Sequence, residues 1–164
     1  MSWNKNTKEI CIKAYSRVQM LTKLKYAGIC RDDLLLIYKL FIRSVIEYCS
    51  VAFHTSLTLE QNKTLEGIQA TCIKIILGHQ YTDYMSALKI CDIHSLEERR
   101  QQRLLKFSLK CLDDPHNKKM FPKNKKTIGG EVFKVNFART TKYMKSTIPQ
   151  AQRLLNDYFH KKCL

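Results

Sequence analysis

The sequence predicts a mainly α-helical fold, a bundle of about five helices with a basic, loop-rich C-terminal third. Apolar residues recur at helical spacing over most of the chain, and capping boxes precede two of the apolar segments. The apolar share of 45% is enough for a core. We expect a helical bundle over residues 1–114, a basic loop with a short strand over 115–147, and a C-terminal helix over 148–164.

The first predicted helix runs from about Thr7 to Ala27. Apolar residues follow the 3.6-residue period along one of its faces, namely Ile10, Ala14, Val18 and Leu21. Gly28 stands where a C-terminal cap is expected.

The second predicted helix lies in ICRDDLLLIYKLFIRSVIEYCS, residues 29–50. A regular helical wheel places one apolar set on a shared face: Leu34, Ile37, Tyr38, Phe41, Val45 and Tyr48. Only Lys39, Arg43 and Glu47 form a polar stripe. Because so little of the surface is polar, we expect this helix to be central, with neighbours on most sides.

The paired aspartates Asp32 and Asp33 at the head of this stretch raise the question of metal chemistry. Polymerases hold metal ions with carboxylates on a strand turn and need a third carboxylate from a separate strand. Here a helical pattern follows directly, and Gly28 ends the preceding helix. We therefore interpret the pair as an N-terminal helix cap that accepts backbone N–H bonds.

Two capping boxes open the next long helices. TLEQ, residues 58–61, begins one helix. Gly67 inside it predicts close approach of another helix, since glycine costs about 1 kcal/mol against alanine there. A short helix is expected near residues 83–90. SLEE then begins a helix over about residues 95–112.

The C-terminal third is expected to be less regular. It starts with a loop that holds five lysines and no acid within nine residues: Lys118, Lys119, Lys123, Lys125 and Lys126. The alternation in EVFKVNFA, residues 131–138, predicts a short strand with Phe133, Val135 and Phe137 on one side. A last helix begins near Pro149, a residue suited to a first helical position.

Charge is unevenly distributed along the chain, whose formal net charge is +15. Residues 1–98 carry 12 Lys and Arg and 10 Asp and Glu, a net charge of +2, whereas residues 99–164 carry 17 and 4, a net of +13. This asymmetry predicts that the second part faces a polyanion. We expect RNA, DNA or an RNA–DNA hybrid; an acidic protein or an anionic membrane surface would match the same composition.

The helix at 95–112 carries the sharpest functional signal. At about 100° per residue, four cations lie on one narrow stripe opposite an apolar side: Arg99, Arg103, Lys106 and Lys110. No acid on the stripe forms a stabilising pair with them. We predict that the stripe contacts phosphates without reading sequence; the alternative is a solvated face with no partner.

A second basic segment, ARTTKYMKS, follows at residues 138–146. Arg139, Lys142 and Lys145 could extend the phosphate-binding surface. Tyr143 is either a stacking partner for a base or an ordinary packed side chain.

Other chemistry is not indicated. Seven cysteines without a C-x-x-C pair predict reduced thiols used as small buried hydrophobes, and five scattered histidines show no zinc-ligand spacing. Glycine-rich phosphate loops and nucleophile elbows are absent from the sequence. We expect no metal, cofactor, small-molecule substrate or membrane-spanning helix, and an intracellular location, nuclear or cytoplasmic.

Four segments carry a family resemblance: LLLIYKLFIRSVIEYCSVAFH, KTLEGIQATCIKIILG, YMSALKICDIHSLEERRQQRLLKFSLKCLDDP and KYMKSTIPQAQRLLN. In this order they resemble the region downstream of the catalytic palm in reverse transcriptases of non-LTR (LINE or jockey-like) retrotransposons. The resemblance covers about residues 13–156 and implies a helical thumb that grips a template–primer duplex. It implies that three sets of residues belong to family motifs: Tyr38, Arg43, Glu47 and Tyr48; Arg99 and Arg100; Ser146 and Pro149.

The chain departs from that family in ways that bear on activity. The aspartate hairpin of the palm, the fingers and any apurinic-type endonuclease are missing, Met1 stands where a palm should just have ended, and His54 replaces a usual tryptophan. We therefore expect a truncated, non-catalytic fragment of an RNA-directed DNA polymerase, in which Arg100 joins the phosphate-binding cations. Polymerase activity would need a separate palm. The alternative is a structural or protein-interaction remnant with no nucleic-acid role.

Overall fold

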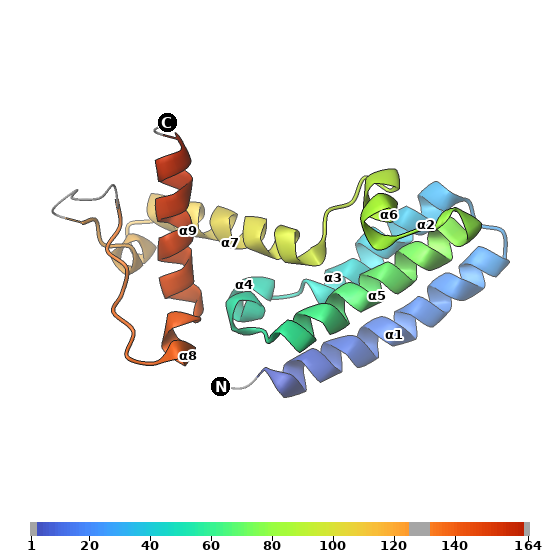
Figure 1. Cartoon of the computed structure of the whole chain (residues 1–164), viewed down its shortest axis with the longest axis horizontal. Helices are drawn as coiled ribbons and strands as arrows, with labels where there is room; N and C mark the ends of the chain where they lie inside the picture. Colours follow the sequence, from blue (N-terminus) through green and yellow to red (C-terminus); the bar gives the residue numbers. More distant parts are fainter. Residues whose placement is uncertain (1–2, 125–131, 163–164) are drawn as a thin grey trace. The chain divides into compact units, whose positions relative to one another are not determined.

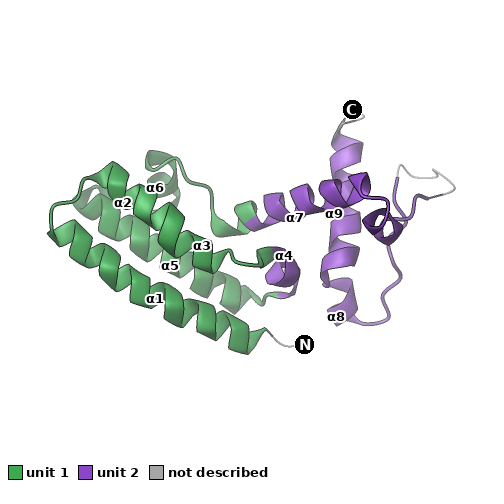
Figure 2. Cartoon of the chain, turned by 180° about the vertical axis from the view of Figure 1, so that it is seen from behind, with its two compact units in different colours: residues 1–50, 57–99 green, residues 51–56, 100–164 purple. Residues whose placement is uncertain are grey.

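The chain is described here by a computed structural model that covers residues 3–124 and 132–162. Within these ranges the fold is mainly α-helical, as predicted. The chain divides into unit 1, residues 1–50 and 57–99, and unit 2, residues 51–56 and 100–164 (Figure 2). This division falls inside a long helix, whereas the sequence suggested boundaries after residues 114 and 147. Lys125, Lys126 and the start of the predicted strand lie outside the described residues.

Unit 1 is built from long helices that lie side by side (Figure 1). Its elements are α1 (Asn4–Tyr26), α2 (Arg31–Ile37), η1 (Tyr38–Ile42), α3 (Arg43–Ile46), α5 (Leu59–Leu77), η3 (Gly78–Gln80) and the short α6 (Tyr84–Ile90). Helix α1 packs on α5 and on α3, and α2 packs on α5. The fully buried side chains between them include Ala14, Leu21, Leu34, Ile42, Leu65, Ile68 and Ile73.

The end of α1 confirms the predicted glycine cap. Gly28 has φ +84°, a left-handed conformation in which a side chain would be strained. Its N–H donates to the Lys25 carbonyl at 3.1 Å, and the N–H of Ile29 donates to the Leu24 carbonyl at 3.2 Å. These two bonds form a Schellman motif, which satisfies the last carbonyls of the helix and turns the chain toward α2.

A turn of π-helix, η1, joins α2 to α3. Four side chains at constant steps of four residues are buried: Leu34, Tyr38, Ile42 and Ile46. In a regular α-helix such a stripe would rotate by about 40° at each step, since a turn takes 3.6 residues. The wider π turn absorbs this rotation. The stripe therefore stays on the face that packs against α1 and α5.

The π turn also exposes side chains that the regular wheel placed inside. Phe41 and Tyr48 were expected on the buried face, yet both are more than half exposed. Leu36 and Leu40 are exposed as well, Leu40 to 60%. The prediction of a central helix with neighbours on most sides is therefore wrong for this face.

The aspartate pair lies at the start of α2, but the cap is not an aspartate. Cys30 is the N-cap residue, and Asp32 and Asp33 occupy the first turn, where carboxylates interact favourably with the positive helix end. The Cys30 thiol lies 3.1 Å from an Asp33 carboxylate oxygen. The pair thus belongs to a helix start, as interpreted, although the capping bonds predicted for it are not formed.

The two predicted capping boxes begin α5 and α7 (Leu96–Asp113). In the first, the Gln61 N–H donates to Thr58 Oγ1 at 3.2 Å, and the Thr58 N–H donates to Gln61 Oε1 at 2.9 Å. In the second, the Glu98 N–H donates to Ser95 Oγ at 3.2 Å. The sequence therefore located both helix starts correctly.

Unit 2 has its own apolar core. Its elements are most of α4 (Ser50–Phe53), η2 (His54–Ser56), α7 from Arg100 onward, η4 (Asn117–Met120), α8 (Thr141–Met144) and α9 (Thr147–Lys162). The buried cluster consists of Leu104, Cys111, Phe121, Phe133, Ala151 and Leu155. The rings of Phe121 and Phe133 meet edge to face, with centroids 6.5 Å apart.

The predicted strand is replaced by an extended segment that pairs with side chains of α9. One β-bridge joins Lys123 to Phe133 among the described residues. Asn156 accepts from the Phe133 N–H at 2.8 Å and donates to the Phe133 carbonyl at 2.9 Å. Gln152 accepts from the Asn136 N–H at 2.8 Å. Because buried backbone groups need partners, these two amides take the place of a neighbouring strand.

Gly67 does not mark a close helix contact, so that prediction is wrong. It is exposed on α5, and an added Cβ would meet nothing within 4 Å. Gly67→Ala should therefore raise the free energy of unfolding by about 1 kcal/mol, measured by urea unfolding. The control Gly28→Ala should lower it by about 1 kcal/mol, because Gly28 is left-handed. A lower stability for Gly67→Ala would contradict this account.

Candidate nucleic-acid interface

Three of the four predicted stripe cations lie on the outside of α7. Arg103, Lys106 and Lys110 are exposed, and we call them the α7 basic face. On the opposite side, Leu104, Ser108 and Cys111 are buried, and Leu105, Leu109 and Leu112 pack against the core of unit 2. The helix thus has one cationic side and one apolar side, as its sequence predicted.

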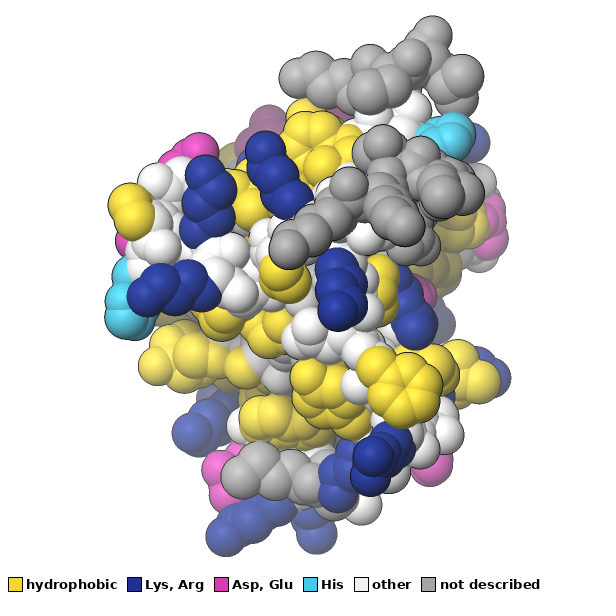
Figure 3. Space-filling model, turned by 90° about the vertical axis from the view of Figure 1, so that its left-hand side faces the viewer, with side chains coloured by type: hydrophobic (Ala, Val, Ile, Leu, Met, Phe, Trp, Pro, Cys, Tyr) yellow, Lys and Arg dark blue, Asp and Glu magenta, His cyan; other side chains and the backbone are white. Residues whose placement is uncertain are grey.

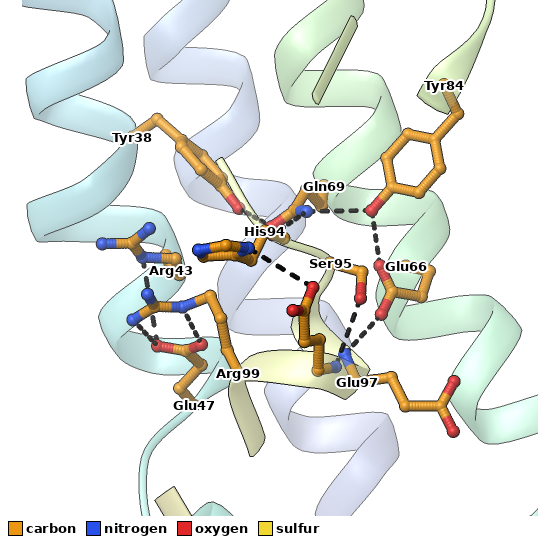
Figure 4. Close-up of polar contacts among 11 residues, drawn as sticks. Tyr38, Arg43, Glu47, Glu66, Gln69, Tyr84, His94, Ser95, Glu97 and Arg99 are labelled. Atoms are coloured by element: carbon orange, nitrogen blue, oxygen red, sulfur yellow. Dashed lines mark hydrogen bonds and ion pairs between the residues drawn. The ribbon is translucent and has the colours of Figure 1, made fainter. Parts of the chain in front are cut away.

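Arg99 is held inside unit 1 by a carboxylate instead of facing solvent with the stripe. Its Nε and one terminal nitrogen donate to the two carboxylate oxygens of Glu47, at 2.7 and 3.2 Å (Figure 4). Glu47 is 1% exposed and also lies 3.9 Å from Arg43. The hydrogen bond that Arg99 donates to Glu47 raises the pKa of Arg99 above its ordinary value. The charge of Arg99 is therefore already matched within the protein.

Arg100 is fully buried, which removes it from the predicted phosphate-binding set. It lies four residues before Leu104 and eight before Ser108, so it shares their inward face. This spacing was visible in the sequence and outweighs the family motif that suggested a surface role. Burial, and then the nearby Arg100 charge, lower the pKa of His54 to about 4. His54 is therefore neutral near pH 7.

The second basic group belongs to α8 and its approach. Arg139, Lys142 and Lys145 are all exposed. Tyr143 is 43% exposed; its N–H donates to Thr140 Oγ1 at 3.2 Å, and its hydroxyl accepts from Asn136 at 3.4 Å. Within unit 2, α8 lies at the N-terminal end of α9, whereas α7 passes nearer the middle of α9 (Figures 1 and 2). The two basic groups thus belong to different helices of unit 2.

In the view of Figure 3, Lys and Arg side chains lie among hydrophobic ones, and the acidic side chains that can be seen lie toward the edges. Aromatic and apolar groups next to cations are typical of proteins that contact nucleic-acid backbone and bases.

The residues assigned to family motifs by the sequence resemblance differ in burial and in contacts. Tyr38 is buried and Tyr48 is exposed. The Ser146 hydroxyl donates to the Tyr143 carbonyl at 2.7 Å. Pro149 lies in the first turn of α9 and is buried, two residues later than the first helical position that was predicted.

Sequence reasoning missed a buried hydrogen-bond network in unit 1. Tyr38 donates to Gln69, whose amide nitrogen donates to the Tyr84 hydroxyl at 2.8 Å, and Tyr84 donates to Glu66 (Figure 4). Glu66 accepts the Glu97 N–H at 2.7 Å, at the first turn of α7. Burial raises the pKa of both tyrosines. They therefore stay protonated and act as structural donors.

Paired carboxylates do not form a metal site in the described part of the chain. Among residues 3–124 and 132–162, no group of three or more His, Cys, Asp or Glu side chains is arranged to hold an ion. Asp32, Asp33 and Asp92 line one hollow, but Arg31 and Lys39 share its wall. Those cations already supply the opposite charge.

The prediction that the cysteines are buried holds for some of them and not for others. Cys72, Cys91 and Cys111 are buried, whereas Cys30 and Cys49 are exposed. Burial raises the pKa of Cys72 to about 12, so its thiol stays protonated. A buried, protonated thiol is chemically inert and fills space in the core.

No family model, curated protein or solved structure matches the chain. The described helices include none that is both long enough and apolar enough to span a membrane.

The Glu47–Arg99 pair generates a stability prediction. Arg99→Met should lower the free energy of unfolding by about 2 kcal/mol or more, because Glu47 would lose its main cationic partner while buried. Lys106→Met removes the same charge from an exposed position and should change stability by no more than about 0.5 kcal/mol. Chemical unfolding of both variants checks this. Equal effects would mean that the pair contributes little.

Proposed function

We propose that this chain is a non-catalytic, thumb-like helical module, related to non-LTR retrotransposon reverse transcriptases, that binds the backbone of RNA, DNA or their hybrid. The observation that carries the proposal is the α7 basic face, three exposed cations with no acid between Arg99 and Leu112. The family relation is supported by the four ordered sequence segments. The helical character of both units agrees with a thumb.

The geometry of the face supports contact with phosphates. Arg103 and Lys110 are seven residues apart, about 10 Å along a helix. That length matches a few successive phosphates of one strand, which lie about 3.4 Å apart along the axis of a duplex. Because Arg99 pairs with Glu47, the basic stripe is shorter than the sequence suggested. Such contacts provide affinity without sequence choice.

No catalytic step is included in this proposal. The carboxylates that could be compared with polymerase ligands, Asp32 and Asp33, lie in the first turn of α2. Both are exposed, and they lie beside Arg31 and Lys39. A polymerase activity would require a palm supplied by a separate chain.

Charge reversal tests the proposal. Arg103→Glu/Lys106→Glu/Lys110→Glu should weaken binding to a labelled RNA–DNA hybrid by about 100-fold at low salt and lower the slope of log affinity against log salt by about 2. Lys5→Glu/Lys8→Glu/Lys13→Glu is the matched control, since it changes the net charge equally at exposed positions of α1. Fluorescence anisotropy over a salt series measures both. Equal losses in the two variants would contradict a specific role for α7.

A second candidate function, a protein-interaction remnant, is favoured by one observation. The α2–η1–α3 helix exposes Leu36, Leu40, Phe41 and Tyr48. Neighbouring exposed apolar side chains of this size mark contact sites. Under this candidate function the α7 basic face binds no nucleic acid, and unit 1 packs on another protein.

Sedimentation tests the second candidate. If the exposed apolar side chains form a protein contact between copies, sedimentation velocity should show concentration-dependent association, and Leu40→Asp should abolish it because it places a charge in the contact. Lys39→Asp, on the neighbouring position, is a control for charge alone. A monomer at all concentrations, together with salt-dependent nucleic-acid binding, would eliminate this candidate.

A further inference from the structure

A partly exposed phenylalanine lies at the edge of the α7 basic face. Phe107 is 39% exposed and does not belong to the apolar cluster that forms the interior of unit 2. It follows Arg103 by four residues and precedes Lys110 by three, the spacings that make side chains neighbours on a helix surface. Lys106 is adjacent in sequence and exposed. An aromatic ring thus lies beside two cations, Arg103 and Lys110, at the border between the basic face and the apolar side of the helix.

Other side chains of α7 contribute to the buried core of unit 2. The inward side of the same helix already supplies Leu104, Ser108 and Cys111 to the buried side of unit 2, with Leu105 and Leu109 beside them. Scattered exposed apolar residues need no explanation, but a ring beside two exposed cations can bind two parts of a nucleotide. The cations can neutralise phosphates, and the ring can stack on a base.

Single-stranded nucleic acid fits this combination better than a duplex. In a duplex the base faces are covered by their neighbours, so a helix that lies along the phosphates meets only backbone and base edges. In a single strand the face of an unpaired base is accessible next to its phosphate. We propose that Phe107 is a base-stacking residue and that the α7 basic face binds unpaired nucleotides of single-stranded RNA or DNA. This inference rests on the proposed function and specifies its ligand.

The test asks whether binding of a single strand depends on an aromatic ring at position 107 or only on an apolar side chain there. Phe107→Leu keeps an apolar side chain but removes the ring, whereas Phe107→Tyr keeps the ring. Binding of labelled oligothymidylate should weaken about tenfold for Phe107→Leu and stay within about twofold for Phe107→Tyr. Binding to a duplex of the same length should be equal in all three proteins. Tyr26→Leu, which removes an 87% exposed ring from unit 1, is the control and should have no effect.

Tryptophan fluorescence reports stacking directly, in addition to the affinity measurements. Trp3 is the single natural tryptophan and lies in unit 1. Phe107→Trp places a second indole at the proposed stacking position, and its fluorescence should be quenched on addition of oligothymidylate and unchanged on addition of duplex. Circular dichroism confirms that each variant is folded.

The outcomes separate this inference from the proposed function. One outcome would overturn base stacking and leave backbone binding intact. In it, Phe107→Leu and the natural chain show the same salt-dependent binding, and the introduced indole of Phe107→Trp is not quenched. Failure of the natural chain to bind any nucleic acid at low salt would overturn both. A tenfold loss on duplex as well as on oligothymidylate would show an apolar contact unrelated to unpaired bases and would also overturn the inference.

Discussion

Packing of the apolar side of α7 against the core of unit 2 is the constraint on which the candidate interface depends. Leu104 and Cys111 join Phe121, Phe133 and Leu155 in one buried cluster, and this fixes the rotation of the helix about its axis. With that rotation fixed, Arg103, Lys106 and Lys110 face solvent while Arg100 faces inward. One hydrophobic contact thus decides which cations a polyanion could reach.

Each unit also contains buried side-chain amides that hold its elements together by hydrogen bonds. In unit 1, Gln69 links Tyr38 to Tyr84 and also donates to the His94 carbonyl at 3.1 Å. In unit 2, Gln152 and Asn156 provide the partners for extended backbone that would otherwise be unsatisfied. A buried polar group without a partner costs about 1–3 kcal/mol. Each amide therefore restricts its neighbours to one arrangement.

Local features were predicted well because their causes lie within one turn of helix. The capping box of α5, the Ser95 cap of α7, the Gly28 cap and the amphipathic division of α7 depend on residues three or four positions apart. The π turn at Tyr38–Ile42 was missed because regular periodicity allows no extra residue. The strand was mispredicted because its alternating pattern cannot show that α9 would supply its hydrogen-bond partners.

By itself, the sequence determined the helical class, the starts of α5 and α7 and the concentration of positive charge in residues 99–164. Only the tertiary structure decided which of those charges reach solvent. Arg99 pairs with Glu47, 52 residues away, and Arg100 is enclosed in the interior. The physical reason is that helix formation and capping are short-range effects, whereas burial and ion pairing depend on elements brought together only when the chain folds.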